Sequence, residues 1–185
     1  LLRGRAIASG MTAPRFIPAF ILVAPQLGEN IGAAARVMAN FGLADLRLVA
    51  PRDGWPNPAA ETMSAGALPD VAKVTVFDTV EQAITDCGVV FATTARPRGM
   101  EKPVLGAGEA VARIRATPAR AAILFGAERA GLPNEAVALA DAILSYPVNA
   151  AFASLNLAQA VALLAHALAE AEAGGPPAAF ADALD

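Results

Sequence analysis

The chain has 185 residues, a length that fits one domain with short appendages. Hydrophobic residues make up 56% of it and charged residues only 17%, which excludes an intrinsically disordered protein. Its formal net charge of -3 excludes a general attraction for nucleic acid, so an RNA partner would have to bind to a local basic patch.

The cysteine content and the longest apolar segment favour a cytoplasmic protein without a membrane span. Cys87 is the only cysteine and cannot form an internal disulfide, which favours a reducing compartment. The apolar segment Ser154–Ala171 is interrupted by Asn156, Gln159 and His166. It therefore falls short of the about 20 clean apolar residues that cross a bilayer.

Apolar runs alternate with helical patterns along most of the chain. The runs predict strands at Ala19–Ala24, Leu46–Ala50, Val74–Phe77, Val89–Thr93, Ala121–Phe125 and Ala142–Tyr146. The first of them has the pattern of a strand that is buried on both faces. Helices are predicted from a cap at Asn30 to a stop at Gly42, and at Pro58–Ala65, Thr79–Cys87, Ala110–Ala116, Pro133–Leu139 and Ser154–Ala171. The segment Arg96–Gly108, rich in proline and glycine, is predicted to be a mobile loop. This alternation predicts a mostly parallel α/β sheet flanked by helices.

The predicted elements form one domain over residues 16–173. Residues 1–15 are expected to be an N-terminal extension, and the part before Met11 is either native or added to the natural sequence. Residues 174–185 are expected to be a tail, or the start of a C-terminal extension that is missing here.

Ligands of parallel sheets bind at the carboxyl ends of strands, so the residues after each predicted strand are candidates for chemistry. After the first strand, Arg36 is the only charged residue in an alanine-rich helical stretch. A helical side chain leans back over the preceding turn, where Gly32 and Ala33 leave room for it. Arg36 can then reach the loop of Asn30 and form an anion or ribose site. The alternative is an arginine that extends into solvent from an ordinary amphipathic helix.

Three further segments follow predicted strands. Gly126–Gly131 is a glycine-flanked turn in which Glu128 is a fixed acceptor, and its alternative is a plain turn that Glu128 helps to cap. Thr93 and Thr94 place two hydroxyl groups at a strand end, where such residues are usually turn and cap residues. Ser154 is expected to cap the last helix, which leaves Asn156 without a local role.

The histidine and cysteine content argues against two kinds of catalysis. His166 is the only histidine and lies inside the last predicted helix, so a Ser-His-acid triad and a histidine-based metal site are both unavailable. We therefore expect no metal. The remaining arginine, asparagine, glutamate and serine side chains suit group transfer between a bound donor and a positioned acceptor.

Three segments together resemble a known family. NIGAAAR with NFGL, then ILFGAERAGLPNE, then YP followed by SLNLAQAVALLAHAL, are similar to the three motifs of the SpoU, or TrmH-like, branch of the SPOUT RNA methyltransferases. They span about Phe20 to Ala171, in the order and spacing of the family. Each block alone is weakly specific, whereas the trio is highly specific. Within the branch, GENIGAAAR, TTAR and SLNLAQAV look most like the TrmJ enzymes, tRNA 2'-O-methyltransferases that act at nucleotide 32 of the anticodon loop.

The resemblance implies a C-terminal deep trefoil knot, S-adenosylmethionine bound in that knot, and a homodimer with active sites at the interface. By the pattern of the family, the catalytic set is Arg36, Asn30, Glu128, Ser154 and Asn156. Because a guanidinium rarely loses its proton, we expect Arg36 to orient the ribose and a phosphate rather than to act as a base. The residues implied to hold the cofactor, and S-adenosylhomocysteine as product, are Thr93, Thr94, Ala95, Phe125, Gly126, Glu128, Gly131, Leu144, Tyr146, Pro147, Ser154, Leu155 and Asn156.

The activity expected from the resemblance is 2'-O-methylation of a tRNA ribose. Cations in predicted loops are expected to bind the RNA, although loop arginines are as often merely solvated; they are Arg15, Arg52, Arg96, Arg98 and Lys102. Two alternatives stay open: the same reaction at another tRNA or rRNA position, and a non-catalytic RNA- or nucleotide-binding module. A dinucleotide oxidoreductase is disfavoured because a GxGxxG segment is absent.

Overall fold

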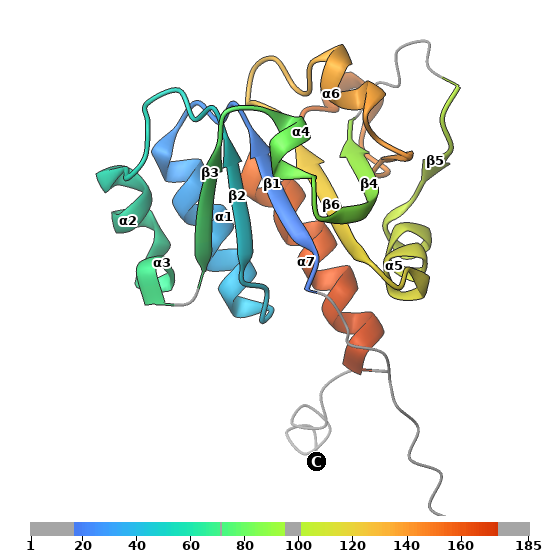
Figure 1. Cartoon of the computed structure of the whole chain (residues 1–185), viewed down its shortest axis with the longest axis horizontal. Helices are drawn as coiled ribbons and strands as arrows, with labels where there is room; N and C mark the ends of the chain where they lie inside the picture. The colour runs from blue at the N-terminus through green and yellow to red at the C-terminus, as the bar shows by residue number, and fades with distance from the viewer. Residues whose placement is uncertain (1–16, 71, 95–100, 174–185) are drawn as a thin grey trace, which may run out of the picture.

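The computed structural model describes residues 17–70, 72–94 and 101–173. Its centre is a seven-stranded sheet in the order β3-β2-β1-β6-β4-β7-β5, in which all neighbouring strands are parallel (Figure 1). The strands are β1 (Ala19–Val23), β2 (Asp45–Val49), β3 (Lys73–Phe77), β4 (Cys87–Thr93), β5 (Val104–Leu105), β6 (Arg120–Phe125) and β7 (Ala142–Leu144). The predicted parallel α/β sheet is therefore confirmed.

The helices follow most of the predicted positions, with differences in length. They are α1 (Gly28–Asn40), α2 (Pro58–Ser64), α3 (Ala67–Asp70), α4 (Val80–Ala83), α5 (Ala107–Ala116), α6 (Asn134–Ala138) and α7 (Leu157–Ala173), with a 3-10 turn at Ala150–Phe152. The predicted helix Thr79–Cys87 is wrong in extent, because Thr79 caps the short α4 by accepting from the Gln82 amide at 3.3 Å and Cys87 already belongs to β4. The predicted loop Arg96–Gly108 contains β5 and the start of α5, while residues 95–100 lie outside the described part.

Both faces of the central strands are covered, which explains why β1 and β7 are apolar without alternation, whereas the edge strand β3 is largely exposed. Phe20 and Leu22 of β1 belong to a core that includes residues of α1, α5 and α7. Their neighbours Ile21 and Val23 point to the opposite face and pack with residues of α4 and α6. Successive residues of a strand thus serve two separate cores.

Two glycines let α1 and α2 pack closely. A Cβ atom on Gly28 would lie 2.2 Å from Oδ1 of Asn57, and one on Gly32 would lie 2.2 Å from the carbonyl oxygen of Ala60. Asn57 caps α2 by accepting from the amides of Ala59 and Ala60 at 3.0 and 3.2 Å. Gly28 and Gly32 therefore allow α1 to pack closely against α2, and this packing sets the position of α1.

The last helix, α7, is apolar but not buried all round. Val161, Leu164 and Leu168 lie in the core, whereas Leu163 is 45% exposed and His166 pairs with Glu170 at 3.5 Å. Within the described residues, no helix is both long enough and apolar enough to cross a bilayer.

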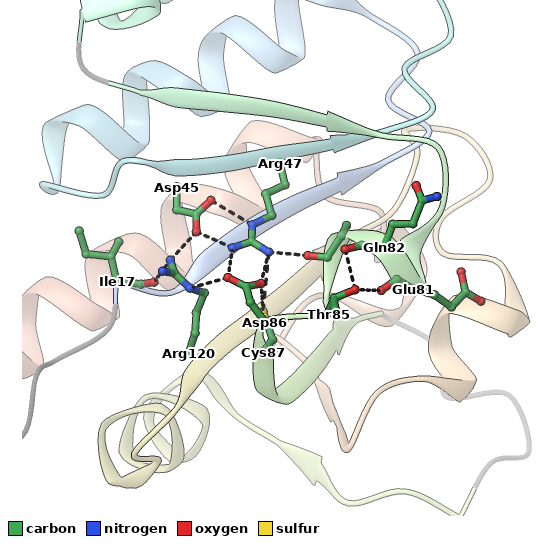
Figure 2. Close-up of polar contacts among 10 residues, drawn as sticks. Ile17, Asp45, Arg47, Glu81, Gln82, Thr85, Asp86, Cys87 and Arg120 are labelled. Carbon is green, nitrogen blue, oxygen red and sulfur yellow. Dashed lines mark hydrogen bonds and ion pairs between the residues drawn. The ribbon is translucent and has the colours of Figure 1, made fainter.

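A charged cluster closes the amino-terminal edge of the sheet (Figure 2). Arg47 of β2 is only 7% exposed and forms ion pairs with Asp45 at 2.9 Å and with Asp86 at 2.5 Å. Arg120, the first residue of β6, pairs with the same carboxylates at 2.6 and 3.1 Å. The guanidinium of Arg47 lowers the pKa of Asp86 to about 2, and burial raises the pKa of the Cys87 thiol to about 12. The four charged groups neutralise one another at the edge opposite the carboxyl ends.

Candidate active site

A cavity of about 450 Å³ lies at the carboxyl ends of β4, β6 and β7, which are neighbours in the sheet. Thr93 ends β4 and Phe125 ends β6, and both line the cavity together with Tyr146, which follows β7. The other walls are the loop after β6 and the segment that leads into α7. This is the edge of the sheet where the sequence predicted a ligand site.

The loop after β6 folds back on itself because of its glycines. A Cβ atom on Gly126 would lie 2.2 Å from the carbonyl carbon of Gly131 and from the amide nitrogen of Leu132. Gly131 has a φ of +67°, a conformation that favours glycine, and its amide donates to the carbonyl of Ala127 at 2.8 Å. The loop thereby turns Glu128 toward the start of α1.

Glu128 accepts hydrogen bonds from three donors of the segment that opens α1. Its carboxylate takes the amide of Gln26 at 2.8 Å, the amide of Leu27 at 3.1 Å and Nδ2 of Asn30 at 2.8 Å. Leu27 stands at the helix N-cap position and makes no cap bond with its own side chain. Burial alone would raise the pKa of Glu128, but these hydrogen bonds hold the pKa below its ordinary value. Glu128 thus provides from a distant loop the negative charge that stabilises a helix start.

Asn30 and Asn156 extend this network to α7. Nδ2 of Asn156 donates to Oδ1 of Asn30 at 3.0 Å, while Oδ1 of Asn156 accepts from the amides of Ala158 and Gln159 at 2.9 and 3.3 Å. Asn156 is therefore the N-cap of α7, and the predicted cap at Ser154 is wrong. The predicted cap at Asn30 is also wrong, because α1 begins at Gly28 and the Asn30 side chain bonds to other segments.

Arg36 lies apart from these residues. It is exposed on α1, does not line the cavity, and makes no hydrogen bond or ion pair within the described part of the chain. The predicted contact between its guanidinium and the loop of Asn30 is not made in this single chain.

Most of the residues predicted to bind the cofactor line the cavity; they are Thr93, Thr94, Phe125, Gly126, Glu128, Gly131, Tyr146, Ser154 and Leu155. Leu144 is fully buried, and Pro147 and Asn156 lie outside the lining. Ala95 lies outside the described residues.

Of the cations predicted to bind RNA, the structure describes only Arg52 and Lys102, and neither lines the cavity. Arg15, Arg96 and Arg98 lie outside the described residues. Arg52 pairs with Asp53 at 2.8 Å, and Lys102 donates to the carbonyl of Ala138 at 2.9 Å and also to that of Ala140, at the end of α6.

Several residues that line the cavity were not among the predicted site residues, and two of them have large exposed side chains. Arg129, next to Glu128, lines it with an exposed side chain, and so does Phe152 of the 3-10 turn. The signal for Phe152 was present, since it is a lone aromatic residue among alanines in a predicted loop. The hydroxyl of Tyr146 donates to the carbonyl of Ala160 at 2.8 Å and so ties the loop after β7 to α7. Burial raises the pKa of that hydroxyl.

The fold and the site define a parallel α/β domain with a cavity at the carboxyl ends of its strands, the place where domains of this class bind their ligands. More narrowly, the chain belongs to the SpoU rRNA methylase family, whose model matches residues 18–166. The predicted family is therefore confirmed.

Its similarity to solved and curated proteins points in the same direction. TrmJ from Z. mobilis ZM4 is 55% identical, with a TM-score of 0.81 over 84% of this chain and 69% of that one. The tRNA (cytidine/uridine-2'-O-)-methyltransferase TrmJ of Yersinia pestis (strain Pestoides F) is 37% identical over 148 residues, which are 79% of this chain and 57% of that protein. AviRb from Streptomyces viridochromogenes, solved with AdoMet, is 18% identical with a TM-score of 0.69 over 85% of this chain and 58% of that one, and shares the fold. The chain spans about three fifths of the length of the curated relatives it matches.

Proposed function

We propose that this chain carries an S-adenosylmethionine-dependent ribose 2'-O-methyltransferase activity that acts in the cytoplasm on tRNA, at nucleotide 32. The observation that supports it best is the network of Glu128, Asn30 and Asn156, because it joins three distant segments beside one cavity. The names of the TrmJ relatives support a tRNA substrate. The position rests on the resemblance of the three motifs.

The residues at the cavity fit S-adenosylmethionine. The volume lies within the about 300–1,000 Å³ of small-molecule sites. Phe125, Leu132 and Val137 offer an apolar wall for a flat base, and Gly126 lets backbone approach a ligand closely. When bound, the cofactor supplies a methyl group activated by a positively charged sulfur.

The chain's own residues act mainly by position. Transfer of the methyl group to the ribose 2'-oxygen would leave S-adenosylhomocysteine with the bonding pair on its sulfur, and the hydroxyl proton would pass to water or to an RNA phosphate. Glu128 and Asn30 already satisfy each other, so we assign them to holding the loop after β6 against α1. Ser154 lines the cavity with an exposed side chain, and we assign its hydroxyl to the ribose. Alignment of two reacting atoms can contribute about 7–11 kcal/mol, so such positioning supplies much of the rate.

Arg36 can take part in this reaction if the protein is a homodimer in which Arg36 of one copy reaches the site of the other. Its side chain is exposed and away from the cavity of its own chain, so we assign it to the ribose and phosphate of RNA bound at a second copy. Arg36→Ala is then expected to abolish methyl transfer while calorimetric binding of S-adenosylmethionine is kept. Unchanged transfer would remove Arg36 from this role, and sedimentation of the protein as a monomer would refute the dimer.

The deep trefoil knot is also part of the proposal. Its support is that β6 lies between β1 and β4 while β7 lies on the far side of β4, so the C-terminal segments pass among strands formed earlier in the chain. An experimental trace from residue 120 to residue 173 that passes through no loop would refute the knot.

The test of the function is methylation of total tRNA and total rRNA with a methyl-labelled cofactor, followed by mapping of the modified nucleotide. We expect a ribose 2'-O-methyl group in the tRNA anticodon loop. A label on a base would refute the reaction, and a label in rRNA alone would refute the substrate. Cofactor binding without transfer to either RNA would favour the non-catalytic module.

A further inference from the structure

The most exposed large apolar side chain in the described residues is Phe152, which is 81% exposed, and the next is Val104 at 51%. Its neighbours Ala150, Ala151 and Ala153 are too small to cover it. The backbone beneath it is nevertheless held in place. Oδ1 of Asn149 accepts from the amide of Ala151 at 2.9 Å, and the amide of Phe152 donates to the Asn149 carbonyl at 2.9 Å. A fixed turn therefore presents the ring to solvent.

The position of the ring relates it to the cavity. Phe152 lines the cavity from the segment that leads to Ser154, and Arg129 lines it from the loop after β6. Arg129 is the only cation among the described lining residues, and it makes no ion pair there. Arg52 and Lys102, by contrast, are engaged by Asp53 and by the carbonyls at the end of α6. The cavity thus offers one free aromatic ring and one free guanidinium on two different walls.

We propose that Phe152 stacks on the base of the RNA nucleotide whose ribose enters the cavity, and that Arg129 binds the phosphate beside it. This rests on the proposed function. Bases splayed out of single-stranded loops are commonly held by aromatic rings, and a ring accepts any base face. A guanidinium binds a phosphate through two parallel hydrogen bonds. The stack explains why a large apolar ring stays exposed here, and it predicts that cytidine and uridine are accepted alike.

The test measures binding of a fluorescein-labelled RNA hairpin with an anticodon-type loop, in the presence of S-adenosylhomocysteine. Phe152→Ala is expected to weaken RNA binding by about 5- to 160-fold, which corresponds to the about 1–3 kcal/mol of one base–aromatic stack. Phe152→Tyr should bind as the parent does, and Phe152→Leu should fall in between. Val76→Ala is the matched control, because Val76 is 43% exposed on β3 and does not line the cavity.

A change in the RNA separates stacking from a general apolar effect. In a hairpin that is abasic at the mapped methylation site, Phe152→Ala should bind as tightly as the parent, because the ring has lost its base. Phe152→Trp should show quenching of indole emission on addition of the intact hairpin, above the constant signal of Trp55. For Arg129→Ala, the slope of log K against log salt should fall by about 0.7, the value for one single-strand phosphate, and Arg129→Lys should keep the slope.

Three results would overturn the proposal. The first is an RNA affinity of Phe152→Ala equal to that of the parent. The second is a loss of S-adenosylhomocysteine binding by calorimetry, which would make the ring a cover of the cofactor. The third is a change in sedimentation, which would make it a subunit contact. If the parent methylates RNA while any of these occurs, only this proposal fails; if the parent neither binds nor methylates RNA, the proposed function fails as well.

Discussion

Gly32→Ala tests whether the glycines of α1 are there for helix packing. The new Cβ atom would lie 2.2 Å from the carbonyl oxygen of Ala60 and 2.9 Å from Cβ of Met63, whereas ordinary contacts are 3.4–4 Å. A backbone carbonyl in α2 cannot swing aside as a side chain can, so the two helices must separate. Overpacking costs about 1–3 kcal/mol, and we expect the upper part of this range.

Helix propensity opposes this effect, because alanine is favoured over glycine by about 1 kcal/mol inside a helix. The net expectation is a free energy of unfolding lowered by about 1–2 kcal/mol, which lowers Tm by roughly 2–8 °C for a chain of this size. The assay is urea denaturation combined with a thermal melt. Because α1 also carries Asn30, binding of S-adenosylmethionine should weaken in the same variant.

The matched control is Gly108→Ala in α5. There a Cβ atom would meet no heavy atom within 4 Å, so only helix propensity changes and stability should rise by up to about 1 kcal/mol. The same substitution thus has opposite signs in two helices. A Gly32→Ala protein as stable as the parent would refute the packing argument.

Three further predictions concern the two edges of the sheet. Glu128→Gln should lower the free energy of unfolding by about 1–3 kcal/mol in urea melts. Both carboxylate oxygens of Glu128 accept hydrogen bonds, and glutamine replaces one of them with an NH₂ group, which faces an N–H donor and leaves it without an acceptor. Equal stability would contradict this. Asn156→Asp should keep the helix cap but turn a carboxylate oxygen toward Oδ1 of Asn30, so both the urea midpoint and methyl transfer should fall. Asn156→Ala should lose the cap as well, at a cost of about 0.5–2 kcal/mol of stability. Arg47 lowers the pKa of Asp86 to about 2 in the folded protein, against about 3.9 in the unfolded chain. The ion pair therefore stabilises the fold fully above about pH 3.9, and this stabilisation is lost as the pH falls toward 2. Asp86→Asn should flatten the urea midpoint as a function of pH in that range.

Most of the sheet could be predicted from the sequence because its central strands are buried on both faces. Runs such as AFILV leave no polar position, and prolines border several of them. The elements that were missed, β5 and α3, contain two and four residues, too few to show a period. The order of the strands was not predictable from such runs, because it depends on contacts between distant segments.

The same limit explains the two wrong caps. Ser154 and Asn30 each stand before or within a helical pattern and are good capping residues by type. Which residue caps a helix depends on where the backbone turns into it, and here α7 begins only after Asn156. Asn30 bonds to a carboxylate at position 128, which is brought near because β6 pairs with β1. Only the resemblance of three motifs indicated that these segments meet.

The pairing of β1 with β6 also explains how a carboxylate from a distant loop reaches the start of α1. The two strands end side by side, with Leu22 opposite Phe125, so the loop after β6 emerges next to the loop that opens α1. Glu128 can therefore stabilise the start of α1, and Asn30 can link that start to α7. Within the described residues, every buried side-chain polar atom has a hydrogen-bond partner. The polar groups beside the cavity are thus in place before a ligand binds, and binding need not reorder them.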